Sequence, residues 1–143
     1  EVRMIGAFRT FTPEARSGIA ERLQRTARSI AESAGATAEV KISGAMPVLV
    51  NDPALTAQAR TALSSSFAGN LRELPFMTSS EDFAYYAKDI PAVFFRLGVT
   101  ARGRDAEHAP TNHSPEFHVD EAALIHGVRA FLTLVEMRSN KAN

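Results

Sequence analysis

Residues 91–98 read PAVFFRLG, a short and nearly continuous apolar run bounded by proline and glycine. Such a run is typical of a strand buried on both faces, as in the parallel sheets of α/β proteins. Working outward, residues 100–117 (TARGRDAEHAPTNHSPEF) show no periodicity and follow this run at its C-terminal end. Open α/β sheets place their sites in loops at that end of a strand. The sequence therefore predicts an α/β fold with a site in this loop.

The remaining segments supply helices and further strands. Thr12-Pro13 and Asp52-Pro53 each combine an N-cap residue with proline at the first helical position. Apolar stripes extend these starts and predict helices over 13–34 and 53–68, with others over 80–88 and 120–138. The shorter one has two overlapping cap signals and the last has one: Thr78 with Glu81, Ser79 with Asp82, and Asp120.

Alternating apolar residues predict strands over 1–11 and 37–43. Residues 1–43 thus read strand, helix, strand, and the pattern breaks before Pro47, where we place a domain boundary. Because the chain begins inside a predicted strand and without Met, we interpret it as part of a longer protein. An edited N-terminal tag is the alternative.

Composition excludes several classes of function. The 143 residues are 45% hydrophobic, and 16 basic residues balance 16 acidic ones. This balance gives no field that favours nucleic acid or an anionic membrane, and no apolar run approaches the roughly 20 residues that span a bilayer. Cysteine is absent, which excludes disulfides, thiolate metal sites and a cysteine nucleophile on this chain. The default compartment is the cytoplasm.

Four histidines are candidates for chemistry, and three have ordinary interpretations. His126 lies beside the stripe of the last helix and reads as a surface residue, whereas His118 suits capping or a surface role. His108 is expected to be solvated in its loop. The adjacent acids Glu81 and Asp82 read as a helix cap rather than as a catalytic pair.

His113 differs because Asn112 and Ser114-Pro115 flank it with turn chemistry. A neutral imidazole on a fixed backbone suits a metal such as Zn²⁺. One imidazole is not a site, however, and the spacing alone favours a structural role.

Five segments together resemble one family. They read GAFRTF (6–11), VNDPAL (50–55), SEDFAYY (80–86), PAVFFRLG (91–98) and TNHSPEF (111–117). In this order the chain resembles the C-terminal part of the dinuclear metal amidohydrolases of the aminoacylase/carboxypeptidase superfamily. The most similar subfamily comprises hippurate hydrolases, N-acyl-amino-acid amidohydrolases and indole-acetyl-amino-acid hydrolases. Two positions depart from the pattern: Ser79, where Gly or Ala is common, and Ala7, where Thr is usual.

The resemblance implies a division of the chain. Residues 1–47 are similar to the second part of an α+β lid, which usually also forms a homodimer. Residues 48–143 are similar to the C-terminal segment of an α/β, zinc-exopeptidase-like catalytic domain. The implied substrate is a small N-acyl amino acid of the hippurate kind, cleaved at its amide bond by metal-activated water.

The same resemblance implies the site. His113 corresponds to a ligand of a centre holding two divalent ions (Zn, Mn, Co or Ni), and Ser80, Glu81 and Asp82 to a wall beside it. The other ligands and the general-base glutamate belong to an N-terminal segment absent from this sequence. We therefore expect no catalytic residue on this chain and no activity from it alone. The alternative is a non-catalytic lid or assembly module, or a regulatory relative without the metal segment.

Overall fold

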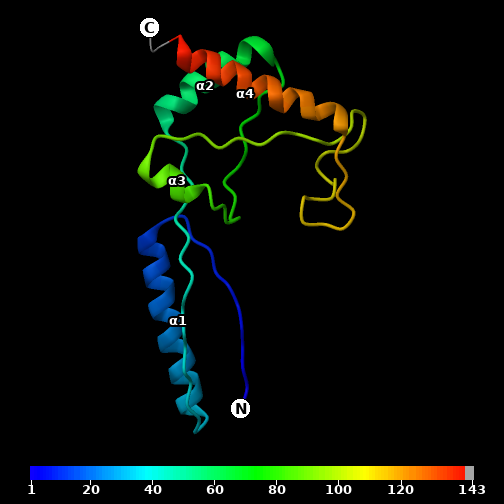
Figure 1. The fold of residues 1–143 in the computed structure, drawn as a ribbon. Helices are drawn as coiled ribbons and strands as arrows, with labels where there is room; N and C mark the ends of the chain where they lie inside the picture. The colour runs from blue at the N-terminus through cyan, green and yellow to red at the C-terminus, as the bar shows by residue number, and fades with distance from the viewer. Residues whose placement is uncertain (141–143) are drawn as a thin grey trace. The chain divides into compact units, whose positions relative to one another are not determined.

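The computed structural model describes residues 1–140 (Figure 1). Helix formation follows the sequence signals closely. The described helices are α1 (Pro13–Ser33), α2 (Pro53–Ser66), α3 (Ala84–Asp89), the 3₁₀ turn η1 (Glu121–Ala123) and α4 (Leu124–Ser139). Within residues 1–140, no helix is both long enough and apolar enough to cross a membrane.

Polar caps fix three of the helix starts. The Thr12 hydroxyl accepts a hydrogen bond from the amide of Ala15 at 3.1 Å, and Asp52 Oδ1 accepts from Leu55 at 2.6 Å. Asp120 Oδ1 accepts from Ala122 at 3.1 Å and so begins η1, which leads into α4. Each cap satisfies an amide that the first helical turn leaves without a partner. These predicted caps are confirmed.

The start of α3 is a correction to the sequence prediction. The helix begins at Ala84 rather than at residue 80, and its N-cap residue Phe83 makes no side-chain cap hydrogen bond. Residues 81–83 form a turn instead, in which the carbonyl of Glu81 accepts from Ala84 and that of Asp82 accepts from Tyr85. Glu81 Oε1 accepts from the amide of Phe83 at 3.3 Å, so its carboxylate stabilises this turn instead of capping a longer helix.

The expected strands also differ. Within residues 1–140 the segments 1–11, 37–43 and 92–98 form no strand ladder, so the α/β class is not visible in the described chain. A strand is defined by hydrogen bonds to a neighbouring strand, and its own sequence supplies only the extended shape and the pattern of side chains. That pattern persists: Ala38, Val40 and Ile42 are half-buried, whereas the residues between them are exposed.

The chain divides into two units by contact. Unit 1 comprises Glu1–Val50 with Leu74–Ala92, and unit 2 comprises Asn51–Glu73 with the chain from Val93 onward. In unit 1 the rings of Phe11 and Phe76 lie 5.9 Å apart, and the hydroxyl of Tyr85 donates to the carbonyl of Ala45 at 3.2 Å. The division into a lid over 1–47 and a catalytic segment over 48–143 stays a prediction.

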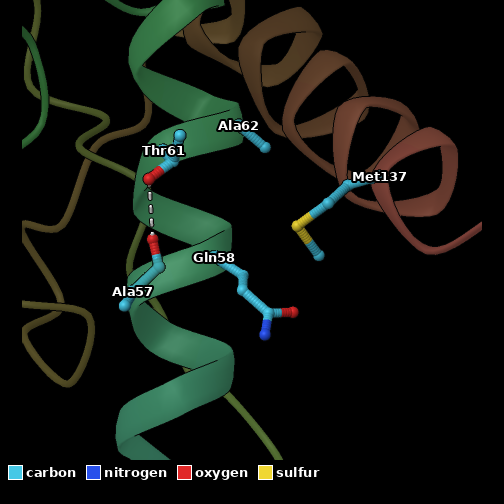
Figure 2. A pocket seen from close by; sticks show the side chains of 5 residues that line it. All are labelled: Ala57, Gln58, Thr61, Ala62 and Met137. Atoms are coloured by element: carbon cyan, nitrogen blue, oxygen red, sulfur yellow. Dashed lines mark hydrogen bonds between the residues drawn. The ribbon is translucent and has the colours of Figure 1, made fainter. Parts of the chain in front are cut away.

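The core of unit 2 lies where α2 packs on α4. Ala59 and Leu63 of α2 and Ala130 of α4 are buried there. A hollow of about 380 Å³ borders this packing (Figure 2), and its lining residues are Ala57, Gln58, Thr61, Ala62 and Met137. None of these side chains titrates, so the hollow offers no acid, base or metal ligand.

The apolar stripe of α4 is not the face that packs. Phe131 and Val135 are 63% and 61% exposed, and so, at about half or more, are Leu124, Val128 and Leu132. The buried residue of α4 is instead Ala130, a small side chain outside this stripe. The stripe expected to face a core therefore stays largely exposed, and within residues 1–140 the ring of Phe131 meets that of Phe95.

Candidate functional site

His113 lies in a turn whose backbone is fixed by hydrogen bonds. The amide of Ser114 donates to the carbonyl of Thr111 at 2.9 Å, and the amide of Phe117 donates to the carbonyl of Ser114 at 3.0 Å. The Ser114 hydroxyl also accepts from the amide of Glu116 at 3.2 Å. The turn predicted around His113 is therefore present. Serine and proline favour such a turn, because the serine hydroxyl can accept a nearby backbone amide and proline restricts the backbone.

The imidazole of His113 is exposed, and no group among residues 1–140 forms a hydrogen bond or ion pair with it. Both ring nitrogens are thus available to a ligand. The loop that carries the ring is closed at its base, since the amide of Asp120 donates to the carbonyl of Val99 at 2.9 Å. A loop of this kind presents its side chains from a fixed base.

His108 forms a pair that the sequence did not reveal. Its Nδ1 lies 2.7 Å from Asp105 Oδ2, while Asp105 Oδ1 accepts from the amides of Glu107 at 2.9 Å and His108 at 3.4 Å. The hydrogen bond from the His108 ring, with those backbone amides, lowers the pKa of Asp105 below its ordinary value. The available signal was an Asp at the start of a turn with His three residues later.

The other two histidines have ordinary surroundings. His126 is exposed on α4, and its ring meets that of Phe67 edge-on with centroids 6.2 Å apart. His118 is exposed, and the cap before α4 is provided by Asp120. Neither residue forms a hydrogen bond or an ion pair with His113 within residues 1–140, and both interpretations as surface residues agree with their exposure.

The segment predicted to form a wall, Ser80-Glu81-Asp82, lies in unit 1, whereas His113 lies in unit 2. Glu81 is half-buried, and its carboxylate accepts a hydrogen bond from the amide of Phe83 in the turn. Ser80 and Asp82 are exposed. The wall assignment stays a prediction.

The described residues do not complete a metal centre. No group of three or more His, Asp or Glu residues in the described chain is arranged to hold a metal ion. A closed zinc site takes about four donors, and His113 would supply one of them, so its role as a metal ligand stays a prediction.

The comparisons with known proteins place the chain in a class. A family model described as "Peptidase family M20/M25/M40" matches residues 4–137. The class that this model describes is that of peptidases, which are hydrolytic enzymes. The chain belongs to peptidase family M20/M25/M40.

Individual relatives agree with this placement. An N-acetyl-L-cysteine deacetylase of Bacillus subtilis is 33% identical over 120 residues, covering 84% of this chain and 27% of the relative. An N-acetyldiaminopimelate deacetylase of Enterococcus faecalis is 30% identical over 132 residues, covering 91% and 33%. Thermostable carboxypeptidase 2 of Saccharolobus solfataricus is 31% identical over 142 residues, covering 99% and 35%.

The chain spans about a third of the length of these curated relatives. No solved structure matches it significantly.

Proposed function

We propose that this chain is the C-terminal part of a dinuclear metal-dependent amidohydrolase that removes the acyl group from N-acyl amino acids. The observation that carries the proposal is an imidazole, His113, held on a fixed turn within the matched region and without a protein partner among residues 1–140. Two relatives are named deacetylases of N-acetylated amino acids, which supports an N-acyl amino acid as substrate.

In this proposal His113 contributes one neutral nitrogen ligand. The ions, when bound, would polarise the amide carbonyl and lower the pKa of the attacking water. The further ligands and the glutamate that takes the proton from water would come from a segment outside this sequence. Ser80, Glu81 and Asp82 would line the site, with no proton transfer assigned to them.

The substrate class extends to hippurate-like compounds, in which a bulkier benzoyl group replaces acetyl. Thermostable carboxypeptidase 2 is also a relative, and hydrolysis of a linear amide is the chemistry that peptidase and deacetylase names share. The size of the pocket that binds the acyl group would decide which of these substrates is cleaved. An enzyme that contains this chain should therefore be assayed on N-acetyl amino acids, hippurate and dipeptides in parallel.

The same experiment tests the role of metal. Dialysis against a chelator should abolish turnover, and adding back Zn²⁺, Mn²⁺, Co²⁺ or Ni²⁺ singly should restore it and identify the preferred ion. The proposal would be contradicted if turnover survived chelation in an enzyme that elemental analysis shows to contain no bound metal. A lack of turnover with every one of these ions would instead favour the alternative of a non-catalytic assembly module.

We also propose a homodimer through residues 1–47. The support is a lone helix, α1, in which no residue is buried and Ile19, Leu23 and Ile30 are exposed. An exposed apolar stripe of this kind favours association. Light scattering at rising protein concentration tests it, and a strict monomer throughout would contradict it.

A further inference from the structure

The side chain of Asn51 forms two hydrogen bonds with the backbone of one distant residue. Its Nδ2 donates to the carbonyl of Phe94 at 2.9 Å, and its Oδ1 accepts from the amide of Phe94 at 2.8 Å. The pair is partly buried, and 43 residues separate its members in the chain. The amide therefore binds Phe94 as a neighbouring strand would, through one donor and one acceptor.

Asn51 itself is held in place by the helix that follows it. The next residue, Asp52, caps α2, and its backbone carbonyl accepts from Thr56 at 2.9 Å. Asn51 thus joins the start of a capped helix to the segment 93–99. Both Asn51 and Phe94 stand within two residues of a point where the chain passes between the two units.

Beyond Phe94 the segment 93–99 rests on α4. The rings of Phe95 and Phe131 lie 5.3 Å apart. Leu97 packs against Gly127 so closely that a Cβ at residue 127 would lie 3.2 Å from Leu97 Cδ2. This distance is tighter than ordinary van der Waals contact, which is near 3.5–4.0 Å.

The segment ends at the base of the loop that carries His113. The carbonyl of Val99 accepts from the amide of Asp120, and residues 100–119 lie between these two groups. The position of Val99 therefore sets the position of the loop base. The backbone of residues 93–99 therefore connects Phe94, which Asn51 binds, to Val99 at the base of the loop.

We infer that Asn51 is a positioning residue for the loop of His113, acting through the register of residues 93–99. Its functional meaning, a ligand held in place, rests on the proposed function, whereas the mechanical link does not. Metal ligands depend on outer groups that fix their orientation, and small displacements of a site cost much of its performance. Asparagine suits the role because it supplies a donor and an acceptor together, while aspartate keeps only the acceptor.

The test uses the ¹⁵N-labelled 143-residue chain and amide hydrogen exchange. In Asn51→Ala, exchange at the amides of both Phe94 and Asp120 should rise about tenfold, as expected when a hydrogen bond that holds a segment is lost. The amide signals of residues 111–117 should also shift. Asn70→Ala is the matched control, because the side-chain Nδ2 of Asn70 donates an exposed 3.3 Å hydrogen bond to the nearby carbonyl of Ala68, and this variant should leave all of these signals unchanged.

The isosteric variant Asn51→Asp keeps the test valid if the alanine variant does not fold. Its carboxylate has no donor for the carbonyl of Phe94 and repels it, so exchange at the amide of Asp120 should also rise. Faster exchange at Phe94 with no change at Asp120 or in residues 111–117 would overturn the inference. The Asn51–Phe94 hydrogen bonds would then stabilise only their own surroundings. None of these readings requires metal or turnover. If they succeed while Co²⁺ affinity of the longer enzyme is unchanged in Asn51→Asp, the ligand role of His113 fails and the positioning link stands.

Discussion

The ring Nδ1 of His108 lies 2.7 Å from Asp105 Oδ2, and Asp105 Oδ1 accepts two backbone amides of the same turn. The carboxylate thus organises residues 105–108 through three hydrogen bonds, all of which favour its charged form. This arrangement connects the shape of the loop to the ionisation of one exposed acid.

We predict that Asp105 titrates below its ordinary pKa of 3.8, because the His108 ring and the two amides stabilise the carboxylate. A lowered pKa in the folded loop means that the contribution is present above the unfolded value and is lost as pH falls through the folded value. A ¹³C titration of the Asp105 carboxyl should therefore place its midpoint below 3.8.

The matched variant for this titration is His108→Ala, which removes the largest cause and should move the Asp105 midpoint upward. His118→Ala leaves the turn intact and serves as the control. If the Asp105 midpoint is the same with and without His108, the His108 ring does not stabilise the carboxylate and the prediction is wrong.

We predict that Asp52→Ala destabilises the chain by about 0.5–2 kcal/mol, the usual cost of an N-cap. The carboxylate accepts from the amide of Leu55 at 2.6 Å, and α2 carries Ala59 and Leu63 of the buried core. Urea unfolding measures the change. Asp52→Asn retains an acceptor and should lose only a small part of the stability, so equal losses in the two variants would contradict a capping role.

Two alanines on α2 provide a packing test. Ala59 is 5% exposed against α4, whereas Ala54 is exposed near the start of the same helix. Ala59→Leu should destabilise by about 1–3 kcal/mol, because added volume in a packed contact forces side chains and backbone apart. Ala54→Leu, with the same change in composition, should stay within about 0.5 kcal/mol. Thermal unfolding of both variants makes the comparison.

The sequence predicted the helices well because their signals are local. Thr12 and Asp52 each cap a helix that begins at the next residue, and each cap is read from a single short motif. The start of α3 failed because Glu81 has two uses at similar spacing, a cap or a turn, and its carboxylate binds the amide of Phe83 in a turn.

Strands and buried faces depend on partners, so the sequence predicted them less well. The segment 92–98 has the composition of a buried strand, but its ladder requires neighbours that residues 1–140 do not supply. Ala130, outside the obvious stripe, makes the core contact of α4, since α2 determines which face is covered. The turn of His113 was predictable, whereas the Asp105–His108 pair required the loop's three-dimensional course.

In an enzyme containing the whole family domain, His113→Ala should reduce metal content and turnover together. The imidazole is exposed on a fixed turn, so its removal should leave the fold intact. His118→Ala, also exposed and five residues later, is the control and should retain both properties. Elemental analysis and an assay on the same preparations decide the matter, and full metal with full activity in His113→Ala would end the ligand assignment.

The 143-residue chain by itself should bind Zn²⁺ weakly and should not hydrolyse N-acyl amino acids. Structural zinc sites with all ligands present bind with about 10–16 kcal/mol, and one imidazole retains only a small part of that. His108 keeps Nε2 as a possible second donor, because only its Nδ1 faces Asp105 at 2.7 Å, but two imidazoles still fall short of the roughly four donors of a closed site. A general base is equally needed to take the proton from water, and we expect that glutamate from a segment outside this sequence. Calorimetry with Zn²⁺ and a hippurate assay test both statements.

Mixing the chain with a separately expressed segment that carries the remaining ligands should restore metal binding and turnover together. Tight binding of two ions and turnover by the chain alone would require a complete site among His108, His113, Glu81 and Asp82, and would overturn the two-segment account.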